Sequence, residues 1–106
     1  MMSKSSITIE AVKLPPTHPG LILADELAEI GVSAAALSRA LDVPQSRLAE
    51  IVAGRRGVTA DTALRLAAYF GTSARFWLNL QASYDLAVTE AKEGAHIVAV
   101  VRPRAA

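Results

Sequence analysis

The fold is decided by residues 33–58, which are SAAALSRALDVPQSRLAEIVAGRRGV. Ser33 is a typical N-cap residue, because its hydroxyl can accept a hydrogen bond from a backbone N–H at a helix start, and the three alanines that follow favour helix strongly. The apolar residues of this first helix are spaced three or four apart and therefore form one buried stripe, made of Leu37, Ala40 and Leu41. Arg39 points away from that stripe.

A second helix follows after a tight turn at Asp42 and Val43. Pro44 disfavours helix at the residue before it and suits the first position of a new helix, whereas Gly54 is a natural left-handed C-cap. The buried stripe of this second helix consists of Leu48, Ile51 and Val52. The residues left facing outward are polar, namely Gln45, Ser46, Arg47 and Glu50.

These outward residues have the chemistry of a DNA-reading surface. In a helix-turn-helix, residues at the N-terminus of the second helix reach base edges in the major groove. Gln45 can pair bidentately with adenine, Ser46 can donate or accept, and Arg47 can reach guanine or a phosphate. Glu50 can accept from a cytosine amino group or can repel phosphate at wrong sites. The alternative is a helical hairpin in a bundle, whose polar side chains only face solvent.

Charge is concentrated around the same helix. The net charge is only +1, but residues 44–75 contain five basic and two acidic side chains, an excess of +3. Arg55 and Arg56 follow the second helix directly. This distribution, rather than the net charge, favours a polyanionic partner such as DNA.

The chain resembles the Cro/C1-type (XRE) helix-turn-helix proteins and, more narrowly, the HigA-type antitoxins. The resemblance extends from about Pro16 to Leu86 and rests on short blocks, which are Pro19-Gly20, Leu37-Ser38, Val43-Pro44, LAEI at 48–51, GRRG at 54–57, TADTALRL at 59–66 and FWLNLQ at 76–81. The last three blocks together are specific to the HigA-like branch. Ser38 and Asp42 depart from the alanine and glycine that such proteins commonly carry, but both are compatible with the motif, since Asp tolerates a left-handed turn.

The resemblance implies a mainly α, lambda-repressor-like domain of five helices. It also implies a DNA-binding antitoxin that represses its own operon as a homodimer on a palindromic operator of double-stranded DNA. The toxin that it neutralises would be a small, HigB-like protein that cleaves RNA. The loop after the second helix would run beside a DNA strand, which assigns phosphate contacts to Arg55 and Arg56. Arg39 on the first helix and Ser33 at its N-cap are further candidates for phosphate contact.

Two other functions stay open at this point. A stand-alone transcriptional regulator would use the same DNA surface with no toxin partner. A protein-interaction adaptor would make the helix pair structural and would use the ends of the chain as its active surface.

The remaining helices form the scaffold. One begins at Pro19-Gly20, where His18 serves its start, and ends at Gly31; another runs from the Thr59 cap to Gly71. The last begins at Thr72-Ser73, and its apolar face contains Trp77, Leu80 and Tyr84. This face is a candidate for the core or for the dimer interface, whereas Gln81 lies off it and is expected to face solvent.

Both ends of the chain have the pattern of short strands. Residues 7–12 alternate apolar and polar side chains, and residues 97–101 are a β-branched run before Pro103, with His96 at its start. Three segments are therefore expected: an N-terminal extension (1–16), a DNA-binding domain (17–93) and a C-terminal tail (94–106). The strands would pair with each other, with a second subunit or with a partner, unless the ends are disordered tails.

Several function classes are disfavoured. The chain contains no cysteine, so disulfides, thiolate metal sites and cysteine nucleophiles are absent. His18 and His96 have no ligand or carboxylate spacing around them, so no enzymatic activity, cofactor or metal is expected. The sequence shows neither a signal peptide nor a membrane span, so the expected location is the cytoplasm.

Overall fold

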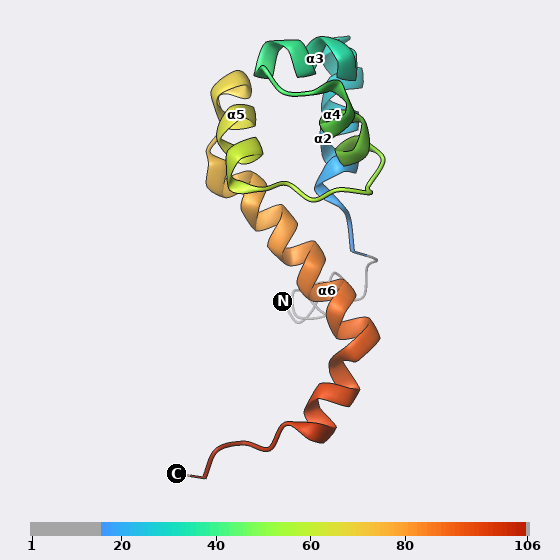
Figure 1. The fold of residues 1–106 in the computed structure, drawn as a ribbon, viewed down its shortest axis with the longest axis vertical. Helices are drawn as coiled ribbons and strands as arrows, with labels where there is room; N and C mark the ends of the chain where they lie inside the picture. Colours follow the sequence, from blue (N-terminus) through green and yellow to red (C-terminus); the bar gives the residue numbers. More distant parts are fainter. Residues whose placement is uncertain (1–15, 106) are drawn as a thin grey trace, which may run out of the picture.

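The computed structural model describes residues 16–105, which form five helices and no strand (Figure 1). The helices are α2 (Pro19–Ile30), α3 (Ala34–Leu41), α4 (Gln45–Val52), α5 (Ala60–Phe70) and α6 (Ala74–Val100). The mainly α fold predicted from the sequence is confirmed. In the described part of the chain, no helix is both long and apolar enough to cross a membrane.

The helix ends lie where the capping residues place them. The hydroxyl of Ser33 accepts from the N–H of Ala36 at 3.0 Å, and that of Ser73 accepts from the N–H of Phe76 at 3.0 Å. His18 caps α2 with its ring, since Nδ1 accepts from the N–H of Gly20 at 2.8 Å. These contacts satisfy N–H groups that have no partner within their own helix.

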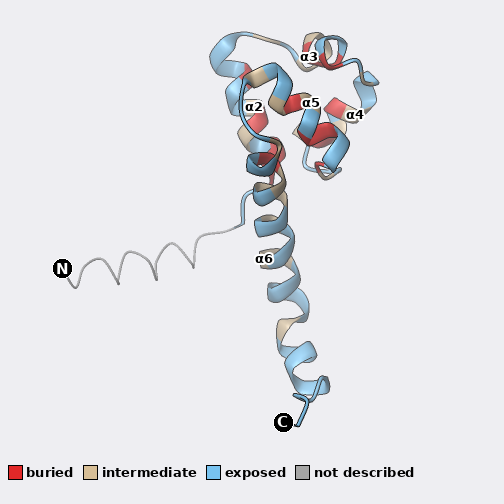
Figure 2. Cartoon of the chain, turned by 90° about the vertical axis from the view of Figure 1, so that its left-hand side faces the viewer, coloured by how far each residue is buried: buried red, intermediate tan, exposed pale blue. Residues whose placement is uncertain are grey.

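The core lies where α2, α3, α4 and α5 meet, and α6 closes it from below with the indole of Trp77 (Figures 1 and 2). Its buried apolar residues are Leu23, Leu27, Leu37, Leu41, Leu48, Ile51, Val58, Ala63, Leu66 and Trp77. The stripes predicted for α3 and α4 supply four of these residues. Burying them fixes α4 in place, so its outer face is presented on a rigid support.

The second half of α6 extends away from the body and is exposed almost throughout (Figure 2). The predicted strand at 97–101 is therefore wrong: α6 continues to Val100, and His96 lies within the helix. No proline lies between the start of α6 and Pro103, so a helix already begun continues through a β-branched run, whose strand preference is only a weak, context-dependent bias. The strand predicted at 7–12 lies outside the described residues.

Candidate nucleic-acid interface

The turn between α3 and α4 depends on one strained residue. Asp42 has a φ of 58°, in the left-handed region, and it is the only non-glycine residue among those described with a positive φ. The N–H of Val43 then donates to the carbonyl of Ser38 at 3.0 Å, which closes the end of α3. An aspartate tolerates this conformation better than most side chains, so the turn forms without the usual glycine, as predicted.

The N-terminus of α4 is open toward solvent. Gln45 and Ser46 are both exposed, and Pro44 stands at the N-cap without a side-chain hydrogen bond to the first turn. The first backbone N–H groups of α4 are therefore available, and they carry the positive end of the helix dipole. An anion such as a DNA phosphate suits this position, next to two side chains able to reach bases.

The other two predicted base-reading residues lie in ion pairs. Nη1 of Arg47 lies 2.8 Å from Oδ2 of Asp61 on α5, and Nε of Arg56 lies 2.8 Å from Oε1 of Glu50. Both pairs are partly exposed, so each contributes little to stability and can open when DNA competes. Of the four residues predicted to read bases, Gln45 and Ser46 are exposed and make no side-chain hydrogen bond to a described residue. Arg47 and Glu50 are instead held in ion pairs.

The loop after α4 is held by a residue from α6. Gly54 has a φ of 77°, which turns the chain, and the N–H of Arg55 donates back to the carbonyl of Glu50 at 2.8 Å. At the far end of the loop, Oε1 of Gln81 accepts from the N–H of Val58 at 2.7 Å. Gln81 therefore does not simply face solvent, as its place on the helix suggested; it fixes the loop that presents Arg55.

The predicted phosphate-contacting residues lie along α3 and in the loop that follows α4. Arg55 and Arg56 are exposed in the loop, and Ser33 and Arg39 are exposed at the two ends of α3. Ser33 already accepts a hydrogen bond through its oxygen, but its hydroxyl proton remains available to a phosphate. Whether these residues touch DNA stays a prediction.

Arg65 on α5 supports the turn, a role that the sequence did not reveal. Its Nη1 donates to the carbonyls of Leu41 and Asp42 at 2.8 and 3.3 Å, and its Nε donates to Asp61 at 3.0 Å. These carbonyls have no partner within α3, since they stand at its end. The only signal in the sequence was the i,i+4 spacing of Asp61 and Arg65, which is typical of a helix-surface ion pair.

Comparison with known proteins places these features in a family. Residues 23–77 match the Helix-turn-helix family. Virulence-associated protein I of Dichelobacter nodosus is 54% identical over 79 residues, which are 74% of this chain and 73% of that protein. An addiction module antidote protein of a HigA (higA) family from Coxiella burnetii is 47% identical, with a TM-score of 0.83 over 86% of this chain and 100% of that one. This chain belongs to the HigA family of helix-turn-helix proteins.

A further HigA-family structure includes DNA. The antitoxin HigA of Pseudomonas aeruginosa, solved with the higBA promoter, is 48% identical to this chain. The two structures superpose with a TM-score of 0.81 over 85% of this chain and 99% of that one. The family predicted from the sequence is confirmed.

The three residues predicted for the dimer interface of this HigA-family chain differ in how far they are buried. Trp77 is 2% exposed within a single chain, so it belongs to the core and has no surface left for a second subunit. Leu80 and Tyr84 are half-buried, and the ring of Tyr84 lies edge-on to that of His18 with a 4.9 Å separation of centroids. Their part in a dimer stays a prediction.

Asp61 makes the stability of this HigA-family chain depend on pH. Hydrogen bonds from Arg65 and then Arg47 lower the pKa of its carboxyl below the ordinary value of 3.8. A depressed pKa stabilises the folded state above the unfolded-state pKa, and this stabilisation is lost as pH falls through the folded-state pKa. We expect Asp61→Asn to lower the melting temperature at pH 6, by an amount that shrinks as the pH falls below the ordinary carboxyl pKa of 3.8.

Circular dichroism melts of both proteins between pH 6 and 2.5 measure this difference. Asp25→Asn is the matched control, because Asp25 is exposed on α2 and makes no ion pair with a described residue. A difference between wild type and Asp61→Asn that stays constant over the whole pH range would contradict the expectation.

Proposed function

We propose that this protein is a DNA-binding antitoxin that represses its own operon as a homodimer and neutralises a small RNA-cleaving toxin. The observation that carries the proposal is the exposed N-terminus of α4, where Gln45 and Ser46 face solvent, together with the loop after α4, which exposes Arg55 and is held by Gln81. The proposal is also supported by similarity, because this chain is 48% identical to an antitoxin that was solved with the higBA promoter.

The dimer follows from the size of the reading surface. One short helix contacts too few base pairs to select one site, and two copies related by a two-fold axis would read half-sites about 34–36 Å apart on a palindromic operator. We assign Leu80 and Tyr84 to the dimer contact. Gln45, Ser46, Arg47 and Glu50 would contact bases, and Ser33, Arg39, Arg55 and Arg56 would contact phosphates.

Arg47 and Glu50 reach the DNA only by exchanging partners. Arg47 leaves Asp61 for a base or a phosphate, and Glu50 leaves Arg56, which becomes available to the backbone. Both pairs are exposed and monodentate, so this exchange costs little.

The DNA part of the proposal is tested by fluorescence anisotropy with a duplex from upstream of the protein's own gene and a scrambled duplex. At physiological salt we expect the upstream duplex to bind about 10³-fold tighter or more, with two chains per duplex. The double variant Gln45→Ala/Ser46→Ala should lose most of this ratio while its melting temperature is unchanged, because both side chains are exposed. Equal affinity of the wild type for both duplexes would overturn the proposal.

The toxin part is tested by co-expression with the neighbouring small gene. We expect that gene to arrest growth alone and this chain to restore growth and to co-purify with its product. If this chain represses its own promoter, but the neighbouring gene neither arrests growth nor gives a product that co-purifies, the protein is a stand-alone regulator.

A further inference from the structure

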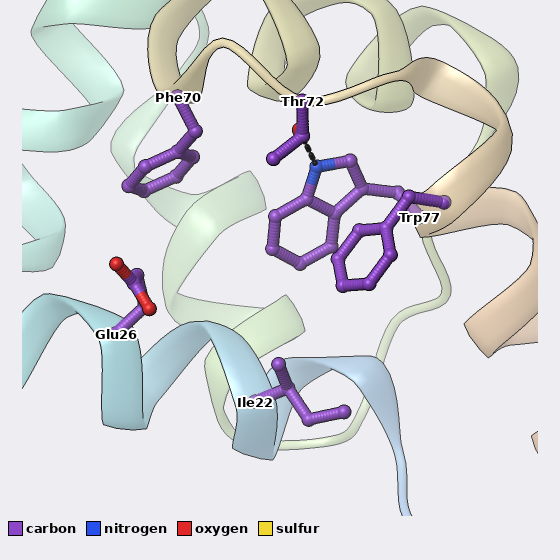
Figure 3. A pocket seen from close by; sticks show the side chains of 6 residues that line it. Ile22, Glu26, Phe70, Thr72 and Trp77 are labelled. Atoms are coloured by element: carbon purple, nitrogen blue, oxygen red, sulfur yellow. Dashed lines mark hydrogen bonds between the residues drawn. The ribbon is translucent and has the colours of Figure 1, made fainter.

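A pocket of about 170 Å³ opens between α2, the end of α5 and the start of α6 (Figure 3). It is lined by Ile22, Glu26, Phe70, Thr72, Phe76 and Trp77. None of these residues belongs to α3, α4 or the loop at 53–58, so the pocket is separate from the proposed DNA surface.

The aromatic wall of the pocket is held in one arrangement. The indole Nε1 of Trp77 donates to the hydroxyl of Thr72 at 3.0 Å, which leaves no unsatisfied polar atom on the ring. The ring of Phe76 stands edge-on to the indole at 5.1 Å between centroids, and that of Phe70 lies at 6.1 Å. A wall fixed before binding loses little conformational freedom when a ligand enters.

Among residues 16–105, Glu26 is the only charged side chain that lines this aromatic pocket. It projects from α2 toward the ring of Phe70, on the opposite side of the opening from Trp77 (Figure 3). Among the residues that the structure describes, Glu26 has no ion-pair partner, and the carboxylates of Asp25 and Glu29 are exposed on the same helix. The pocket therefore combines aromatic side chains with a carboxylate that makes no ion pair with a described residue, on a helix that carries two further exposed carboxylates.

We propose that this pocket binds one arginine side chain of a partner protein. The aliphatic stem of the arginine would pack on Ile22 and Phe76, and its guanidinium would stack on the ring of Phe70 and donate to Glu26. Arginine fits better than lysine because its planar group can stack and donate two parallel hydrogen bonds at once. Arginine anchored in a preformed pocket is also a common centre of binding energy at interfaces.

This proposal rests on the proposed function for the identity of the partner. A protein that cleaves RNA needs basic side chains to hold the phosphate backbone, so its surface is complementary to the acidic face of α2. Because none of the lining residues lies on α4, an arginine in the pocket would not cover the proposed base-reading side chains.

The test uses the single tryptophan of the chain. In ¹⁵N-labelled full-length protein, the Trp77 indole gives one resonance at the wall of the pocket. We expect the peptide Ac-Gly-Arg-Gly-NH₂ to shift this resonance in a saturable way. The same peptide with citrulline, which keeps the planar shape but has no charge, should bind about tenfold more weakly, a difference of about 1.4 kcal/mol.

Two variants separate the carboxylate from the general negative charge of α2. Glu26→Gln should weaken arginine-peptide binding about tenfold, whereas Asp25→Asn, outside the pocket, should change it less than twofold. In the purified complex with the neighbour-encoded partner, Glu26→Gln should lower the affinity by a similar factor and leave operator binding unchanged.

Equal shifts with the arginine and citrulline peptides, or no saturable shift, would overturn the proposal, as would a partner complex that tolerates Glu26→Gln. An indole resonance that moves with protein concentration alone, and stops doing so in Arg102→Gln/Arg104→Gln, would show that the tail of a second copy occupies the pocket instead. The peptide titration contains neither DNA nor toxin, so its outcome is independent of whether the proposed function holds.

Discussion

Gly20→Ala is expected to lower the free energy of unfolding by about 3 kcal/mol. A Cβ at this position would overlap the carbonyl oxygen of Ile51 and would stand 3.0 Å from Nδ1 of His18. The first neighbour is backbone and cannot rotate away, so α2 would have to move from α4. His18 also caps α2 through the N–H of Gly20, and that hydrogen bond would be disturbed as well.

Gly94→Ala is the matched control for this substitution. Gly94 lies within α6, where an added Cβ would meet only Cβ of Glu90 at 3.8 Å, an ordinary contact. Replacing a glycine in a helix by alanine is expected to stabilise by about 0.5–1 kcal/mol. Urea denaturation followed by circular dichroism measures both variants, and an equal effect of the two would show that α2 and α4 do not approach so closely.

Gly20 also illustrates which features of the fold the sequence could show. Pro19-Gly20 predicted the start of a helix, and the N-caps at Ser33 and Thr59 predicted two more, because each signal acts within a few residues. The contact of Gly20 with Ile51 joins two helices 31 positions apart (51 − 20), and no local pattern indicates it. The sequence therefore predicted where the helices begin, but it did not predict which residues of different helices contact each other.

The same distinction holds at the DNA surface. Gln45 and Ser46 were identified from their place at the start of a helix, whereas the pairing of Arg47 with Asp61 and of Gln81 with Val58 spans 14 and 23 positions. Sequence spacing placed Arg47 on the outer face correctly but did not show that α5 offers it a carboxylate. At 97–101 the error was of another kind, since intrinsic strand preference was given more weight than continuity with α6.

Gln45→Ala is expected to give the largest change in DNA recognition. If Gln45 pairs with one adenine in each half-site, its loss should cost about 1–3 kcal/mol per half-site and should relax the preference at that base pair alone. Gln45 is exposed and its side chain has no hydrogen bond to a described residue, so folding should be unaffected. Anisotropy titrations with duplexes changed at single positions in both half-sites would locate the base pair.

Arg55→Ala is the control that separates the two kinds of contact. Arg55 lies exposed in the loop that Gln81 holds, and it is predicted to contact phosphate. Its loss should weaken binding to every duplex alike and should reduce the slope of log affinity against log salt by about one unit per lost contact. Arg56→Ala should act in the same direction but less strongly, because Arg56 must first leave Glu50. If Gln45→Ala and Arg55→Ala instead change affinity and salt slope in the same way, α4 does not insert its N-terminus into the major groove.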